Sequence, residues 1–231
     1  MAWSPSGERL GFEYSTRAGQ GGVAFMHVMS GRITGGPWGH FGGWVDNNLY
    51  MESGAWSHRV LSADTGRMVS SFRLPDDRHY DTLAPVPLTS DGSYVASIHG
   101  DIYPYIGLVG KDFMPRRAIY TWKGFGHVHL TPRVDPMGEC AAWSTDGRVF
   151  THSLRAHPST PASAVQLPNE YLSAEFCDWT EDSRLLINAK LADGSAVLVV
   201  TDVYGRGVRK IPTTVPPMPY SVAPYRKYEH R

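Results

Sequence analysis

The chain of 231 residues has few of the features that mark several large classes of protein. It has only two cysteines, Cys140 and Cys177, which fall on different predicted strands, so we expect two buried free thiols and no disulfide. Lysine plus arginine and aspartate plus glutamate both number 22, so the chain lacks the basic surface of a nucleic-acid-binding protein. No apolar run approaches the roughly 20 residues that span a bilayer, so no membrane span is expected.

Helical signals are also scarce. No window of 12 or more residues combines apolar spacing at i, i+3, i+4 and i+7 with helix caps, so we expect almost no helix. The first residues, Met1–Pro5, lack the basic start and apolar core of a signal peptide. As written, the chain is expected to remain in the cytoplasm where it is made. It would be periplasmic or secreted if its true N-terminus lay further upstream.

The chain is instead rich in turns that recur at a regular spacing. Each turn joins two apolar or aromatic runs, and the five turns end at residues 7, 48, 92, 138 and 183, so the steps are 41, 44, 46 and 45 residues. The turns are Ser4–Gly7, Val45–Asn48, Thr89–Gly92, Asp135–Gly138 and Thr180–Ser183. Short strands that repeat at this length are typical of β-propeller blades.

The repeat predicts an all-β fold, a β-propeller of about five four-stranded blades. We place the propeller at residues 1–212 and a proline-rich C-terminal tail at 213–231. The expected blades are residues 1–38, 39–75, 80–124, 127–168 and 170–212, and the first strand of the third blade is expected at residues 84–88, around Pro85 and Pro87. The tail is predicted to be disordered, or alternatively to add residues 220–222 as an edge strand to the first blade.

The segment Ala2–Phe12 resembles the repeat of TolB-like and related WD-like propellers. That repeat has an aromatic residue, then Ser-Pro-Asp-Gly, two polar residues and an apolar pair, and here Ser6 stands in place of the aspartate. The resemblance implies the fold and leaves the function open, because propellers host many functions. TolB-like propellers usually have six blades, so either the ring closes with five blades or the chain is an N-terminally truncated six-bladed ring.

Two enzymatic alternatives were considered. Several five-bladed propellers are glycoside hydrolases with paired carboxylates on inner strands, and the candidate acids here are Asp135, Glu139, Glu175 and Asp178. Glu175 and Asp178 lie on one strand, while Asp135 and Glu139 flank one turn, whereas such enzymes place the two acids on different blades. A propeller can also be the accessory domain of a prolyl-oligopeptidase-like enzyme. Because the candidate acids do not have the arrangement of glycoside hydrolases, we expect no catalytic residues and favour a non-enzyme.

Metal and cofactor sites are not expected either. His127 and His129 put two imidazoles on one strand face, with His99 and Asp101 in the same or the preceding unit. Two histidines do not satisfy zinc, which takes three or four converging ligands. They remain weak candidates, and no cofactor is predicted.

A binding module remains as the favoured function, with a protein partner or a small ligand docking on one face of the propeller. Loop aromatics are enriched at binding hot spots. The expected contact residues, which could equally close the hydrophobic rim between blades, are Trp38, His40, Phe41, Tyr103 and Tyr105.

Overall fold

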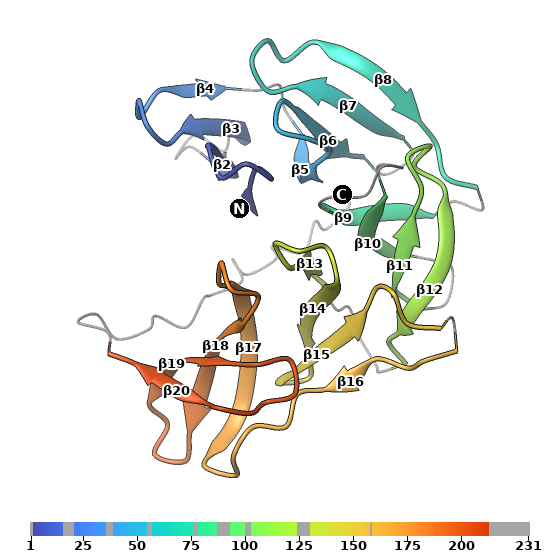
Figure 1. Cartoon of the computed structure of the whole chain (residues 1–231). Helices are drawn as coiled ribbons and strands as arrows, with labels where there is room; N and C mark the ends of the chain where they lie inside the picture. Colours follow the sequence, from blue (N-terminus) through green and yellow to red (C-terminus); the bar gives the residue numbers. More distant parts are fainter. Residues whose placement is uncertain are drawn as a thin grey trace, which may run out of the picture.

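The computed structural model describes residues 2–15, 21–35, 39–54, 57–75, 78–86, 93–99, 103–123, 130–157 and 159–212. These residues form twenty β-strands and no helix, as the sequence predicts (Figure 1). No part of the described chain is therefore a helix that could cross a membrane. The predicted tail at 213–231 and the turn Thr89–Gly92 lie outside the described residues.

The strands are arranged as five antiparallel meanders, which we number units 1 to 5. In every unit each strand pairs with the next one along the chain. Unit 1 contains β1 (Ala2–Trp3), β2 (Arg9–Ser15), β3 (Gly21–His27) and β4 (Ile33–Gly35); unit 2 contains β5 (His40–Trp44), β6 (Leu49–Ser53), β7 (His58–Ser62) and β8 (Met68–Phe72).

The remaining units follow the same order. Unit 3 contains β9 (His79–Pro85), β10 (Tyr94–His99), β11 (Tyr105–Val109) and β12 (Pro115–Thr121); unit 4 contains β13 (Arg133–Val134), β14 (Cys140–Thr145), β15 (Arg148–Ser153) and β16 (Ser163–Ala164); unit 5 contains β17 (Tyr171–Trp179), β18 (Leu185–Leu191), β19 (Ala196–Thr201) and β20 (Arg209–Ile211). The first strand of unit 3 lies earlier than expected, at His79–Pro85 rather than at residues 84–88.

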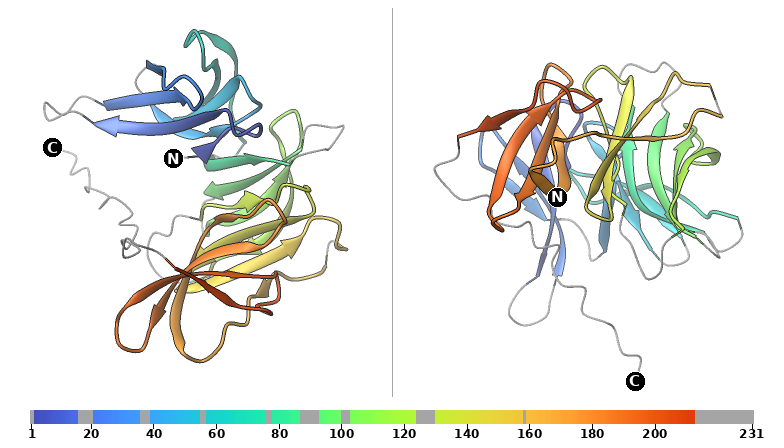
Figure 2. Two further views of the ribbon diagram at one scale, coloured as in Figure 1. Left: turned by 60° about the vertical axis from the view of Figure 1, so that its left-hand side comes forward. Right: turned by 90° about the horizontal axis from the view of Figure 1, so that it is seen from below.

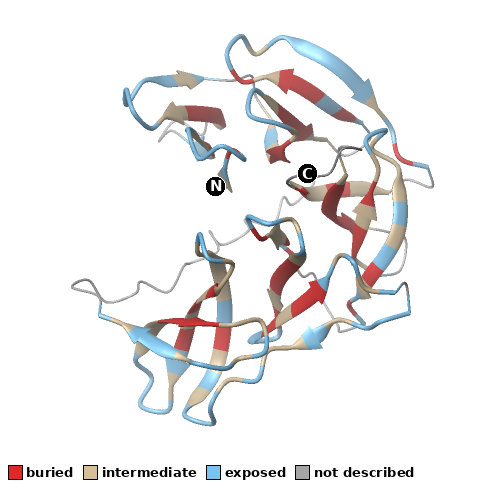
Figure 3. Ribbon diagram, viewed as in Figure 1, coloured by how far each residue is buried: buried red, intermediate tan, exposed pale blue. Residues whose placement is uncertain are grey.

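The units succeed one another around an arc, with unit 1 and unit 5 at its two ends (Figures 1 and 2). The first strand of each unit lies toward the centre of the arc and the fourth strand toward the outside. Buried residues concentrate in the middle strands, where neighbouring units face each other (Figure 3). A sheet that has a neighbour on both sides must be apolar on both faces, which explains why five of the six residues of β10, in the middle unit, are buried.

The recurring turns of the sequence are joined to one another from unit to unit. The backbone N–H of Ser6 donates to Asn47 Oδ1 at 2.8 Å, and Ser183 Oγ donates to Asp135 Oδ2 at 2.9 Å. Asp135 is 2% exposed, and its carboxylate also accepts from the backbone N–H groups of its own turn. The repeat period is therefore the spacing of residues that meet across a sheet-to-sheet contact.

Aromatic side chains fill the contact between units 1 and 2. Phe25 lies with its ring 4.6 Å from that of Tyr50 and 5.3 Å from that of Trp44. Gly11 permits this approach, because a Cβ at that position would lie 2.7 Å from Cζ of Phe41. The predicted packing role of the aromatic residues is thus confirmed at this contact.

Units 2 and 3 are joined more closely than the others. A parallel bridge pairs Gly43 of β5 with Leu83 of β9 and makes the two units one eight-stranded sheet. Gly43 has φ of 135°, and a Cβ there would lie 2.0 Å from the carbonyl oxygen of Leu83. Only glycine allows both this dihedral and this backbone approach.

Candidate binding face

A β-bulge on the first strand of unit 3 sets the geometry of the candidate site. Tyr80 pairs with Ile98 and Thr82 pairs with Ser97, so Asp81 has no partner between them on β10. A bulge of this kind turns the extra side chain onto the face of its neighbours. His79 pairs directly with His99 on the other strand. The bulge therefore brings one carboxylate next to two imidazoles.

The three side chains form a compact group, which we call the His79–Asp81–His99 cluster. His99 Nε2 lies 2.6 Å from Asp81 Oδ2, and His79 Nε2 lies 3.7 Å from Asp81 Oδ1. The two imidazole rings are stacked, with centroids 5.0 Å apart and planes inclined by 20°. The side chains of Asp81 and His99 are 17% and 20% exposed, and that of His79 is 39% exposed, so the cluster can be reached from solvent through His79.

The two histidines have opposite acid–base tendencies. The hydrogen bond to Asp81 raises the pKa of His99, against the effect of burial. Burial lowers the pKa of His79, and the charge of Asp81 only partly compensates. One imidazole therefore favours the protonated form while its neighbour favours the neutral form, and the cluster can offer both a donor and an acceptor nitrogen.

Behind the cluster, His58 of β7 supports β9. Its Nε2 accepts a hydrogen bond from the backbone N–H of Tyr80 at 3.3 Å, which places the proton of the neutral ring on Nδ1. Its ring stacks on that of Phe72, with the centroids 5.2 Å apart, and His58 is 1% exposed. Burial lowers the pKa of His58 to about 4, with a smaller contribution from His79. We assign His58 a structural role because it is buried and neutral.

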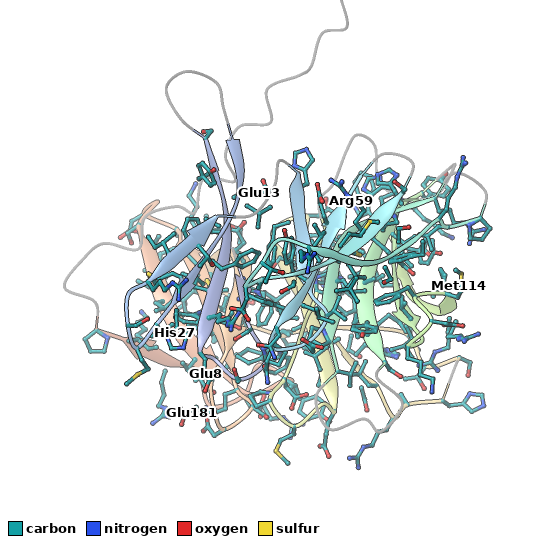
Figure 4. The ribbon with its side chains drawn as sticks, turned by 90° about the horizontal axis from the view of Figure 1, so that it is seen from above. Glu8, Glu13, His27, Arg59, Met114 and Glu181 are labelled. Carbon is teal, nitrogen blue, oxygen red and sulfur yellow. The ribbon has the colours of Figure 1, made fainter. Side chains whose placement is uncertain are left out.

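An ion pair between a buried glutamate and an exposed arginine occupies the same edge of unit 2. Arg59 Nη2 donates to Glu52 Oε1 at 2.6 Å, and the Glu52 side chain is 5% exposed. Figure 4 shows Arg59 and Glu13 toward one end of the strands, on one side of the arc, whereas Glu8, His27 and Glu181 lie toward the opposite side. We call the side that carries Glu13 and Arg59 the upper face. His58 precedes Arg59 and contacts the start of β9, so the cluster belongs to this face.

The predicted aromatic contact residues divide into three groups. Trp38 lies outside the described residues. Phe41 packs against Phe25 and Trp44 at 6.1 and 5.8 Å between ring centroids, so it closes the contact between units 1 and 2. His40 and Tyr103 are accessible to a partner. The side chain of His40 is 80% exposed, and Tyr103 as a whole residue is 43% exposed.

Two further contacts tie the predicted residues to the upper face. His40 Nδ1 lies 3.5 Å from Glu13 Oε1, and the same oxygen accepts from the backbone N–H of Phe41 at 2.8 Å. Tyr105 is partly buried, and its hydroxyl accepts from Arg78 Nη1 at 3.4 Å.

A metal centre is not formed by the residues that can be placed. Within the described ranges, no group of three or more His, Cys, Asp or Glu side chains is arranged to hold a metal ion. The candidates His127 and His129, like Asp101, lie outside those ranges. Leu130, the first described residue after them, accepts a hydrogen bond at its carbonyl from Thr82 Oγ1 at 3.2 Å, beside the cluster.

The acids considered for sugar hydrolysis are mostly held in structural contacts. Asp178 Oδ2 accepts from Arg133 Nη1 at 2.6 Å, and Glu139 pairs with Arg155 at 3.0 Å. Asp135 is buried in its turn. Glu175 is exposed on β17. The free thiols Cys140 and Cys177 are partly buried, and burial raises the pKa of each.

A hollow of about 260 Å³ lies between units 1 and 2, away from the cluster. Two of its charged groups pair with each other, because Arg9 Nη1 lies 2.9 Å from Asp64 Oδ1. The hollow is lined by Arg9, Phe25, His27, Ser30, Arg32, Thr34 and Asp64. It is therefore a weaker candidate than the cluster.

Comparison with known proteins gives similarity in structure alone. No family model matches the sequence, and no curated protein does so either. Among solved structures, an oligogalacturonate lyase in complex with manganese superposes with a TM-score of 0.62 at 13% identity, over 91% of this chain and 64% of that one. TolB from Acinetobacter baumannii gives 0.59 at 11% identity, over 91% of this chain and 54% of that one.

A third neighbour is the calcium-binding protein regucalcin from Agrobacterium tumefaciens, with a TM-score of 0.57 at 11% identity, over 91% of this chain and 71% of that one. The chain has the β-propeller fold. It spans less than two thirds of the length of the lyase and of TolB. At these identities the propeller neighbours, which include an enzyme and non-enzymes, establish the fold and leave the activity to be argued from the site.

Proposed function

We propose that this propeller, of the TolB-like or WD-like kind, is a non-catalytic binding module that takes a small polar ligand at its upper face. The observation that carries the proposal is the His79–Asp81–His99 cluster. Two adjacent imidazoles, that of His99 with a raised pKa and that of His79 with a lowered pKa, contact a carboxylate that is 17% exposed. Convergent polar groups with perturbed pKa values on a rigid scaffold are the usual mark of a ligand site.

Two exposed side chains of the same units belong to the proposed binding surface. His40 and Tyr103 add an exposed imidazole and an exposed phenol to the unit 2 and unit 3 parts of the propeller. Proteins also dock on such faces, so a protein partner is the main alternative occupant. The proposed site differs from the sequence prediction in its centre, which moves from loop aromatics to the bulged strand β9.

The experiment is a titration of the full chain, labelled with ¹³C in its histidine rings, with galacturonic acid oligomers, Ca²⁺ and Mn²⁺. These probes are chosen from what the neighbours' names state. We expect the ring signals of His79 and His99 to shift saturably with at least one probe. Asp81→Asn should weaken that binding at least tenfold while leaving the thermal midpoint of unfolding within a few degrees.

The matched control is His27→Gln, on the opposite side of the arc, which should bind as the parent does. His79→Gln, at the most exposed member of the cluster, guards against a loss of folding in the Asp81 variant. Saturable binding that survives both cluster variants would place the site elsewhere.

An acid–base enzyme is a second candidate, favoured by the 2.6 Å contact between His99 and Asp81. A carboxylate that orients an imidazole is the arrangement a general base requires. Incubation with oligogalacturonate, followed by the ultraviolet absorbance of an unsaturated product, tests for lyase activity. Turnover that disappears in His99→Gln would replace the binding proposal.

A further inference from the structure

Unit 1 presents an apolar sheet face toward the open side of the arc. Alternation along the strands puts Gly11 and Phe25 against unit 2, so their neighbours in the strands point the opposite way. We call this opposite side the free face of unit 1. Its large side chains are Trp3, Leu10, Phe12, Tyr14, Met26 and Ile33, with Ala24 buried among them. None of these side chains carries a charge.

Several members of the free face are strongly exposed. Ile33 is 62% exposed, Trp3 is 48% exposed and Tyr14 is 42% exposed. Their positions are contiguous, because Trp3 pairs with Leu10, Leu10 with Met26, and Met26 with Ile33. Figures 1 and 3 show unit 1 at one end of the arc, with no described sheet against this side. A contiguous apolar surface of this kind normally has an occupant.

The size of the free face argues against a separate folded partner. A strand advances ~3.3 Å per residue and strands lie ~4.8 Å apart, so strands of seven residues in a four-stranded sheet cover at most about 450 Å². A stable interface between separate chains needs roughly 800 Å² on each partner. A tethered occupant does not need that area, because its effective concentration is high.

We propose that residues 213–231 of this same chain cover the free face of unit 1. This segment follows β20, whose last residue, Ile211, belongs to the unit at the other end of the arc (Figure 1). Its 19 residues can span about 60 Å as polyproline II, at ~3.1 Å per residue.

The composition of the segment fits the chemistry of the face. Residues 213–231 include Pro216, Pro217, Pro219 and Pro224, together with Tyr220, Val222 and Tyr225. Proline-rich segments bind aromatic surfaces, and the free face offers Trp3, Phe12 and Tyr14. Proline has no backbone N–H, so such a segment packs on side chains more readily than it extends a sheet edge.

The test uses the full chain with a photo-crosslinking residue, Tyr220→p-benzoylphenylalanine. After illumination, we expect a product of monomer mass, whose crosslinked peptide contains Trp3 or residues of β2 or β3. The matched control places the same group at Tyr204, an exposed residue of unit 5, and should not crosslink to those strands. A second variant, Trp3→Glu in the Tyr220 photo-crosslinking chain, should lower the yield at least fivefold.

Each other outcome overturns the proposal. A product of dimer mass would assign the free face to a second copy of the chain. A crosslink to other units, or none at all, would show that the segment does not lie there. Trp3 is half exposed at the end of a two-residue strand, so Trp3→Glu is expected to fold, and an unchanged crosslink yield in that variant would also contradict the proposal.

Discussion

Trp179 donates its indole N–H to the backbone carbonyl of Arg133 at 3.1 Å, 46 residues earlier in the sequence. Trp44 makes the same kind of bond to the carbonyl of Ala2 at 2.9 Å, across 42 residues. In both cases a tryptophan at the end of a first strand is joined to the first strand of the preceding unit. The indole bond thus stabilises the contact between two neighbouring units near the centre of the arc.

Replacement of this bond should be measurable in the free energy of unfolding. Trp179→Phe keeps an aromatic ring against Phe176 but removes the donor, so we expect a loss of about 1 kcal/mol for the hydrogen bond, plus a similar loss for packing. Urea unfolding followed by circular dichroism measures it. Trp44→Phe should give a loss of the same sign. If neither variant lowers the stability, the indole bonds do not stabilise the contacts.

Loss of Arg59 from the Glu52–Arg59 ion pair should destabilise the protein mainly because it leaves the charge of Glu52 unpaired. Arg59→Met leaves a nearly buried carboxylate without its partner, and we expect the free energy of unfolding to fall by about 2–4 kcal/mol. Glu52→Gln in the same chain should recover at least half of that loss, because an amide is cheaper to bury. A double variant that is no better than Arg59→Met would show that the carboxylate charge is not the cause.

Gly43 should tolerate substitution far less than Gly7, a glycine of positive φ that lies in open space. Gly43→Ala combines a positive φ with a steric overlap with the Leu83 carbonyl, so we expect a loss of about 3 kcal/mol or more. Gly7→Ala is the matched control. It also has positive φ, 72°, but meets no atom within 4 Å, and should cost only about 1–2 kcal/mol. Equal losses would mean that the bridge does not hold units 2 and 3 together.

The burial of His58 should make the folded protein less stable in mild acid than at neutral pH. The pKa of this residue falls from 6.5 to about 4 on folding because of burial. Between these pH values the unfolded chain binds the proton and the folded chain does not. The stability is therefore intact above pH 6.5 and is lost as the pH falls toward 4, by up to about 3 kcal/mol from this group.

The variant that isolates this effect is His58→Phe, which keeps the stacking on Phe72. It should lower the stability at neutral pH by about 1 kcal/mol, since the N–H of Tyr80 loses its acceptor. It should also flatten the pH dependence between 6.5 and 4. Unchanged pH dependence would transfer the effect to another group.

The fold could be predicted because its signal is local and periodic. The turns that close at Gly7, Asn48, Gly138 and Ser183 come shortly before the second strands of units 1, 2, 4 and 5, as the repeat predicts. The start of unit 3 was wrong because Pro85 and Pro87 were taken as the centre of a strand. β9 instead ends at Pro85, where a missing donor costs little.

The candidate site could not be predicted in the same way. The Asp81 position depends on a bulge, and the pairing of His79 with His99 joins residues on separate strands. The position of an extra residue in a ladder and the register of two strands depend on contacts between strands, so neither can be read from the local pattern of a single sequence. His99 was noticed only as a companion of His127 and His129. Phe41, by contrast, was foreseen in both of its possible roles.

The bridge between Gly43 and Leu83 changes how the chain should respond to partial unfolding. A row of sheets that contact only their neighbours behaves as a series of links that can open one at a time. The bridge fuses two of those links, so units 2 and 3 should exchange their amide hydrogens as one cooperative block. The binding face proposed above lies on that block, and its geometry would survive the fraying of either end of the arc.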